Sequence, residues 1–205
     1  MKLIYGTINK AKIQFMKRSV ESLGIEILSL NDVRAPNLEI DESGNTPIEN
    51  AKIKALAYYH ALKQPVFSCD SGLYIDGLDD ARQPGAHVRS VGGHELNDEE
   101  AIMYFSSLAD EFGGSLTARY QHAICLVIDE TRIYEHMGVE IASEPFLIVS
   151  KPHKKRNEGF PLDSLSVHIE SGKYYYDMDN YTRKLAEGKD GFAAFFQRVL
   201  LDKGV

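Results

Sequence analysis

The chain has 205 residues, of which 43% are hydrophobic and 26% are charged. These proportions are typical of a folded globular protein, and they exclude an intrinsically disordered chain. The formal net charge of −7 argues against a nucleic-acid-binding protein, because such proteins usually present a strongly basic surface. An anionic small molecule is still allowed, since a few lysines and a divalent cation can reverse the sign of the charge locally.

The cysteine content and the apolar runs of the chain indicate its compartment. Two cysteines, Cys69 and Cys125, are too few for a disulfide framework and favour a reducing environment. The N-terminal residues are too polar for a signal peptide, and no apolar run reaches the length of a membrane span. We therefore expect a cytoplasmic protein that binds neither nucleic acid nor a membrane, folded as one domain or as two closely merged lobes.

The first 30 residues predict a β-α-β unit. Residues 2–7 and residues 25–30 are each typical of a short strand. Between them, apolar side chains recur at helical spacing over residues 9–23, where Asn9 is suited to cap the helix and Gly24 to end it. Because such units cross over in a right-handed sense, the two strands are expected to pair in parallel.

The next 40 residues predict a loop, a helix and a strand. Residues 31–46 are polar and contain proline and glycine, which is typical of a loop. A helix is expected over residues 47–62, with Thr46 as its cap and Pro47 in its first turn. Residues 65–69 then predict a buried strand that enters an Asp-Ser-Gly turn.

The remainder of the chain has a different pattern. A helix is expected over residues 97–111, followed by antiparallel β-type runs over residues 116–129 and 131–149. Residues 150–164 predict a basic loop, and residues 180–201 predict an amphipathic helix with an interruption near its glycines. The fold class is therefore α/β, with a mixed sheet and flanking helices, in which a parallel half joins an antiparallel lobe.

One candidate anion site lies at the start of the first helix. Lys10 and Lys12 fall in the first helical turn, where they oppose the positive end of the helix dipole. A bound phosphate would offset this cost, because helix N-termini offer unpaired N–H groups to anions. The alternative is a capped surface helix whose lysines are solvated.

Two carboxylates are candidate metal ligands. Asp70 follows a buried strand and precedes small residues, which is where α/β sheets place ligand-binding groups. Glu49 lies in the first turn of its helix, with Lys54 one turn further on. The alternatives are an Asx turn at Asp70 and, for Glu49, an acid that only stabilises the helix dipole.

A candidate base-binding element lies in the basic loop. Phe160 could stack on a base, and the carboxylate of Asp163 could accept hydrogen bonds from its edge. The alternative is a surface loop with one anchored phenylalanine. The histidines show no spacing typical of zinc ligands.

Taken in order, these segments resemble the inosine triphosphate pyrophosphatase family over most of the chain. The family's motifs are matched by Asn9 and Lys12, by Glu49, Asn50, Ala51, Lys54 and Ala55, by Asp70, Ser71, Gly72 and Leu73, and by Pro84, Gly85 and Arg89. The chain departs from the family at Cys69, where the family has Asp, and in the C-terminal base-binding motifs at Pro161, Leu162, Asp177 and Thr182.

The resemblance implies Mg²⁺-dependent hydrolysis of a nucleoside triphosphate, of the deaminated purine type, to the monophosphate and pyrophosphate. It also implies a homodimer and a single domain over residues 1–205, with two lobes around a central nucleotide cleft. In the implied site, Mg²⁺ is held by Glu49 and Asp70, the catalytic groups are Asp70 and Lys12, and the substrate is contacted by Asn9, Lys54, Ser71, Gly72, Phe160, Asp163 and Arg183. The departures leave two alternatives open: the same chemistry on a different or modified nucleotide, and a catalytically inactive nucleotide-binding module.

Overall fold

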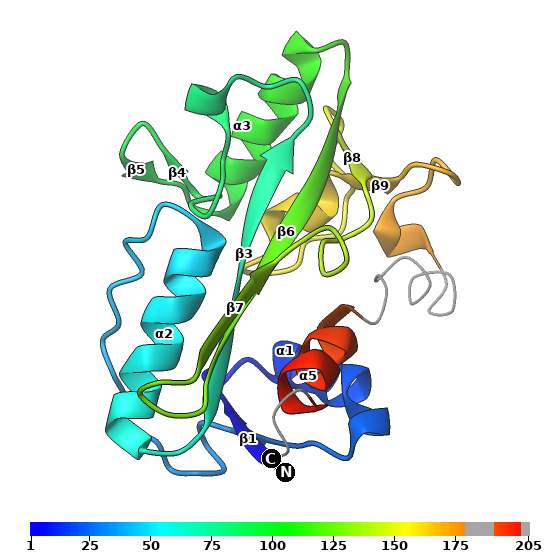
Figure 1. The fold of residues 1–205 in the computed structure, drawn as a ribbon. Coiled ribbons are helices and arrows are strands. Elements are labelled where there is room, and N and C mark those ends of the chain that lie inside the picture. Colours follow the sequence, from blue (N-terminus) through cyan, green and yellow to red (C-terminus); the bar gives the residue numbers. More distant parts are fainter. Residues whose placement is uncertain (179–190, 202–205) are drawn as a thin grey trace. The chain divides into compact units, whose positions relative to one another are not determined.

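The computed structural model of the protein describes residues 1–178 and 191–201 (Figure 1). Its helices are α1 (Lys10–Ser19), α2 (Pro47–Leu62), α3 (Asp98–Glu111) and α5 (Gly191–Leu201). Its strands are β1 (Lys2–Tyr5), β2 (Glu26–Ser29), β3 (Val66–Ile75), β4 (Ser90–Val91), β5 (His94–Glu95), β6 (Ser115–Val127), β7 (Ile133–Met137), β8 (Phe146–Val149) and β9 (Ser166–His168). Among the described residues, none of the helices combines the length and the apolar composition needed to span a lipid bilayer.

The predicted mixed sheet is confirmed. Its strands follow the order β2-β1-β3-β6-β8-β9, and β7 pairs with β6 outside this path. β1 pairs in parallel with both β2 and β3, as the β-α-β pattern predicted. β6 pairs antiparallel with β7 and with β8, and β8 pairs antiparallel with β9. The sequence therefore predicted the class of the fold and the change from parallel to antiparallel pairing.

The bounds of α2 match the prediction, and residues next to each end of the helix explain why it begins and ends there. Thr46 Oγ1 accepts a hydrogen bond from the backbone N–H of Glu49, and Glu49 Oε2 accepts one from the backbone N–H of Thr46 at 3.2 Å. This capping box satisfies two N–H groups at the helix start. At the other end, Lys63 adopts a left-handed conformation with φ of 51°, which ends the helix.

Two predicted boundaries are wrong. The helix expected over residues 9–23 ends at Ser19, and a short 3₁₀ turn at Glu21–Leu23 then leads to Gly24 at φ 64°. The Asp-Ser-Gly turn expected after residue 69 does not form, because β3 continues to Ile75. Leu73 and Ile75 are both buried, and their burial in the core outweighs the local preference of small polar residues for turns.

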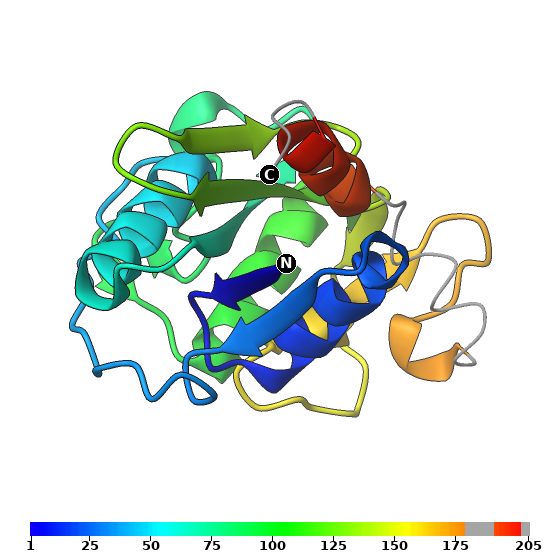
Figure 2. The ribbon, with the colours of Figure 1, turned by 60° about the horizontal axis from the view of Figure 1, so that its bottom comes forward.

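The described chain divides into two compact units. The first comprises residues 1–71, residues 122–141 and the segment that contains α5. Successive residues of β6 here point to opposite faces of the sheet, so that Ile124 belongs to one apolar cluster and Cys125 to another. α1 and α5 cover the first face and α2 covers the second, as Figure 2 also shows for these three helices.

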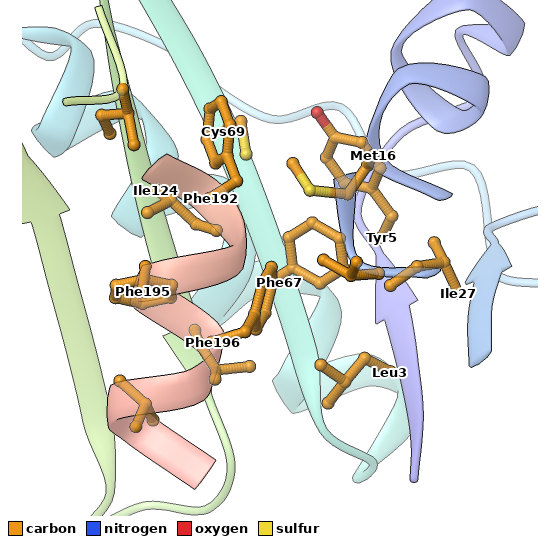
Figure 3. Packing of buried hydrophobic residues seen from close by; sticks show 14 of the residues in the cluster. Leu3, Tyr5, Met16, Ile27, Phe67, Cys69, Ile124, Phe192, Phe195 and Phe196 are labelled. Carbon is orange, nitrogen blue, oxygen red and sulfur yellow. The ribbon is translucent and has the colours of Figure 1, made fainter. Parts of the chain in front are cut away.

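The core of the first unit depends on aromatic side chains of α5. Phe192, Phe195 and Phe196 are buried and point towards the strands in Figure 3. The ring of Phe196 packs edge to face against Phe67 of β3, which in turn stacks on Tyr5 of β1. The C-terminal helix therefore packs against strands from the opposite end of the sequence.

The second unit comprises residues 72–121 and 142–188, of which residues up to 178 are described. Its core forms where α3 packs on β8, with Phe105 and Ile148 fully buried. Asn97 and Glu100 form a capping box at the start of α3, as the predicted helix over residues 97–111 requires. The assignment of all 205 residues to a single domain stays a prediction.

Candidate functional site

The first unit brings Lys54 of α2 into contact with two carboxylates. Lys54 Nζ lies 3.0 Å from Asp70 Oδ1 on β3 and 2.7 Å from Glu42 Oε2 in the loop before α2. The side chain of Lys54 is 12% exposed and that of Asp70 is 15% exposed, whereas that of Glu42 is 46% exposed. The structure therefore joins two residues predicted for the site, and adds Glu42, which the sequence did not single out.

The charge of this lysine is maintained by its partners. Burial is the largest single influence and by itself would lower the pKa of Lys54, but the nearby charges of Asp70 and Glu42 and their hydrogen bonds outweigh it and raise the pKa. The ammonium group thus stays protonated at neutral pH in a largely shielded position. Such a group can bind phosphate oxygens, because anions also favour its charged form.

Glu49 takes part in the local structure of the helix start. Its Oε2 accepts hydrogen bonds from the backbone N–H groups of Asn45 at 2.7 Å and Thr46 at 3.2 Å. The neighbouring Asn50 side chain accepts one from the N–H of Gly44 at 2.9 Å. The Glu-Asn pair of the motif therefore fixes the loop that also carries Glu42.

The first unit contains carboxylates of the chemical kind that binds a divalent ion together with a substrate. Within residues 1–178 and 191–201, no group of three or more His, Cys, Asp or Glu side chains is close enough to hold a metal ion by itself. Mg²⁺ is commonly bound through one or two carboxylates together with substrate phosphates and waters, so oxygen donors such as Glu49 and Asp70 suit it. Their role as ligands stays a prediction.

The start of α1 has the features expected of an anion-binding helix end. Asn9 Oδ1 accepts hydrogen bonds from the N–H groups of Ala11 at 2.9 Å and Lys12 at 3.2 Å, which confirms its capping role. The first turn contains no acidic residue. The charge of Lys12 opposes the rise in the pKa of Cys69 and contributes to the fall in the pKa of His122, so it acts on the same part of the unit as Asp70 and Ser71.

His122 contacts a predicted site residue, although the sequence did not single it out. Its Nδ1 lies 2.7 Å from the Ser71 hydroxyl oxygen, although 51 positions separate the two residues in the chain. Burial, with a smaller contribution from Lys12, lowers the pKa of His122 to about 4. The imidazole is therefore neutral at neutral pH. No local motif could have predicted this pair, because it depends on where β6 lies relative to β3.

Cys69 occupies a buried position beside the site. Burial raises the pKa of its thiol to about 12, despite a hydrogen bond with Tyr5 and the nearby charge of Lys12, both of which lower it. The thiol is thus uncharged at neutral pH, whereas the aspartate of the motif would introduce a carboxylate here. This difference removes one negative charge from the strand that carries Asp70.

The predicted base-binding residues lie in the second unit. Phe160 is 51% exposed, and Asp163 Oδ2 accepts a hydrogen bond from Asn157 Nδ2 at 3.0 Å. Asp98 of α3 anchors the loop, since its carboxylate accepts from the N–H of Gly159 at 2.8 Å and from Arg89 at 2.6 Å. Gly72, at the start of this unit, lies within β3. Arg183 lies outside the described residues.

The chain is similar to one family model and to several named proteins. A family model described as the Ham1 family matches residues 3–183. The dITP/XTP pyrophosphatase of Exiguobacterium sp. is 33% identical over 77% of this chain and 85% of its own length, and that of Bacillus subtilis is 34% identical over 69% and 72%. The match to the Bradyrhizobium diazoefficiens dITP/XTP pyrophosphatase, at 33% identity over 65% of this chain, spans 64% of that protein.

Solved structures agree with this relationship at the level of the fold. A HAM1 protein from Coxiella burnetii superimposes with a TM-score of 0.72 at 20% identity, over 100% of both chains. The Staphylococcus aureus Ham1 protein gives a TM-score of 0.71 at 19% identity, over 99% of this chain and 100% of that one. The length of the family match and the identity to the Exiguobacterium relative together show that this chain belongs to the Ham1 family.

Proposed function

We propose that this chain hydrolyses nucleoside triphosphates that carry a non-standard purine base, releasing pyrophosphate and leaving the nucleoside monophosphate. Membership of the Ham1 family supports this proposal, as do relatives named dITP/XTP pyrophosphatase. A cytoplasmic location and a homodimer are part of the same proposal. The net charge and the small number of cysteines are compatible with an intracellular enzyme of this kind.

The contact between Lys54 and Asp70 is the observation that carries the proposal. It places a shielded ammonium group 3.0 Å from a carboxylate, and both residues lie in the part of the chain that the family model matches. Glu42, the more exposed partner of Lys54, occupies a position that a phosphate oxygen could take over. A triphosphate would then find a cation already oriented, beside a carboxylate able to act on water.

The residues of the chain divide the chemistry between them. Lys12 and Lys54 neutralise the triphosphate, while Asn9, Ser71 and the backbone at Gly72 orient it. Asp70 orients the attacking water and accepts its proton. A divalent ion, proposed to be Mg²⁺ at Glu49 and Asp70, supplies positive charge beside the phosphate oxygens and increases the acidity of nearby water when it is bound. Phe160 stacks on the base, with Asp163 and Arg183 near its edge.

A second candidate function is the same hydrolysis with a different base preference. His153 Nε2 lies 3.4 Å from Asp177 Oδ1 in the second unit, and the ring of His153 lies 5.1 Å from that of Tyr174 and 5.3 Å from that of Tyr176. A carboxylate accepts hydrogen bonds and cannot donate them when ionised, so it favours amino groups over oxo groups on a base. The carboxylate of Asp177 therefore supports testing nucleotides whose base carries an amino group, in addition to the deaminated purines.

The deciding experiment measures pyrophosphate release from a panel of nucleoside triphosphates, with and without Mg²⁺. The proposal expects multiple turnover of dITP or XTP that requires a divalent ion and is lost in Asp70→Asn. Asp110→Asn, at an exposed position of α3, is the matched control and should retain full activity. Preference for an amino-bearing base would support the second candidate, whereas calorimetric binding without product would contradict both hydrolytic proposals and support a nucleotide-binding module.

A further inference from the structure

The hydrogen bond between Ser71 and His122 joins a motif residue to one outside the matched motifs, and it lies next to the proposed catalytic carboxylate. Ser71 follows Asp70 directly in β3, and its Oγ is 2.7 Å from His122 Nδ1 on β6. Both residues belong to the first compact unit. The pair therefore connects the proposed phosphate-binding strand to a neighbouring strand by a side-chain contact.

The imidazole is neutral and is held in place by its surroundings. Its pKa is lowered to about 4 by burial and by Lys12, so at neutral pH it carries a single ring proton. The ring also packs against Phe192 of α5, with the ring centroids 6.3 Å apart and the planes tilted by 38°. A restrained neutral imidazole has two tautomers, and each one gives the Ser71 hydroxyl a different role.

The two tautomers differ in what Ser71 can offer to an anion. If Nδ1 lacks a proton, the Ser71 O–H donates to it, and only oxygen lone pairs face a ligand. If Nδ1 carries the proton, it donates to Ser71 Oγ, and the hydroxyl hydrogen can point towards a phosphate oxygen. Only the second arrangement presents a donor to a triphosphate, since phosphate oxygens accept hydrogen bonds and repel lone pairs.

We propose that His122 is a positioning residue, which donates from Nδ1 to Ser71 Oγ and so directs the Ser71 hydroxyl to a phosphate oxygen of the substrate. This inference rests on the proposed triphosphate-binding function and extends it to a residue outside the family's motifs. Because the donor of the Ser71–phosphate bond is oriented before the ligand arrives, binding costs less conformational entropy. In this assignment His122 acts on the substrate through Ser71.

A double-mutant cycle tests the coupling between the two residues. The binding of inorganic triphosphate in the presence of Mg²⁺ is measured by calorimetry for the wild type, Ser71→Ala, His122→Phe and the double variant. We expect each single variant to bind about threefold to tenfold more weakly, as the loss of one hydrogen bond predicts. The double variant should bind no more weakly than the weaker single variant, because both changes remove the same interaction.

Two conservative variants separate positioning from packing. His122→Asn places an amide where Nδ1 lies and should bind triphosphate within about twofold of the wild type. His122→Gln places its amide at the position of Nε2 and should bind as weakly as His122→Phe. Thermal denaturation of each variant shows that it is folded. Equal binding by the Asn and Gln variants would contradict a role for Nδ1.

The chain offers a matched control in the second unit. His168 Nδ1 lies 3.0 Å from Ser171 Oγ, so it forms the same kind of pair at an exposed turn outside the proposed site. His168→Asn and Ser171→Ala should leave triphosphate binding within about twofold of the wild type. If these changes weaken binding as much as the Ser71 and His122 changes do, the effect is nonspecific and the inference is wrong.

A direct measurement on the wild type completes the test. Nitrogen-15 NMR of the histidine rings should report the proton on Nδ1 of His122 when inorganic triphosphate is bound, and a proton on Nε2 alone would overturn the inference. Hydrolysis of the nucleotide is measured in a separate assay. Turnover of dITP or XTP without coupling between Ser71 and His122 would reject the inference and leave the proposed function standing. Coupled binding without turnover would support the role of His122 and reject the proposed hydrolysis.

Discussion

Lys54 lies 3.0 Å from Asp70, and both side chains are largely shielded from solvent. Replacing Lys54 with Met should therefore leave the carboxylates of Asp70 and Glu42 without their shared cation. We expect a loss of about 2 kcal/mol in the free energy of unfolding, since a shielded charge loses its hydrogen-bonded partner. Denaturant titration measures this, and Lys17→Met, at an exposed lysine of α1, provides the control. Equal stability of the two variants would contradict a structural role for the Lys54 contact.

Two substitutions at the start of α2 separate the structural role of Glu49 from its proposed metal-binding role. Thr46→Ala removes one side of the capping box and should cost about 1 kcal/mol of stability, with little effect on hydrolysis. Glu49→Gln keeps a side chain that can complete the box, so stability should change little. Pyrophosphate release should nevertheless fall by about 100-fold or more, as expected when a charged metal ligand is lost. An active Glu49→Gln variant would show that Glu49 serves only as a cap.

Both cysteines should resist thiol reagents in the folded protein. Cys69 is 9% exposed and Cys125 is fully buried, and burial raises the pKa of each thiol to about 12. Since the thiolate is the reactive form, labelling by DTNB should be slow and should follow the rate of unfolding. Complete labelling in denaturant is the control. Rapid labelling of Cys69 under native conditions would show that its environment is open to solvent.

The turn between β6 and β7 should contribute to stability in a pH-dependent way. Hydrogen bonds from Arg132, then Thr131, lower the pKa of Asp129 from its ordinary value of 3.8 to about 2. Because the pKa of this carboxyl group is lower in the folded than in the unfolded protein, its ionised form stabilises the folded state above pH 3.8. This contribution is lost as the pH falls towards 2. The wild type should therefore be more stable than Asp129→Asn at neutral pH, with the difference shrinking across that range. A constant difference in denaturant titrations would contradict this linkage.

Gly191 begins α5 at a position where the backbone of another segment comes very close. A β-carbon at this position would clash with the backbone carbonyl group of Glu140. Gly191→Ala should therefore destabilise the protein by about 2 kcal/mol or more, because one of the two segments must shift. Ala194→Ser, at an exposed position of the same helix, should change stability by less than about 1 kcal/mol. Thermal and denaturant unfolding of both variants measure the difference.

The sequence predicted those features that depend on neighbouring residues. The bounds of α2 follow from Thr46, Pro47 and the helical pattern between them, all of which are local signals. The turn expected after Cys69 is wrong because the burial of Leu73 outweighs local turn preference, and burial depends on distant parts of the chain. This dependence on tertiary packing limited the prediction at β3.

The candidate site shows the same limit. Lys54 and Asp70 were predicted through motifs, and the structure brings them into contact. Glu42 lies in a loop without periodicity, and His122 reaches Ser71 only through the pairing of distant strands. The partners of motif residues therefore required the three-dimensional structure, whereas the motif residues themselves did not.

The aromatic helix α5 packs on strands that precede it by more than a hundred residues, and this has a consequence for synthesis on the ribosome. While residues after 190 remain in the exit tunnel, Phe67 and its neighbours have already emerged without the side chains that cover them. The nascent chain therefore exposes this apolar surface until α5 emerges, and a partly synthesised chain is prone to aggregate through it.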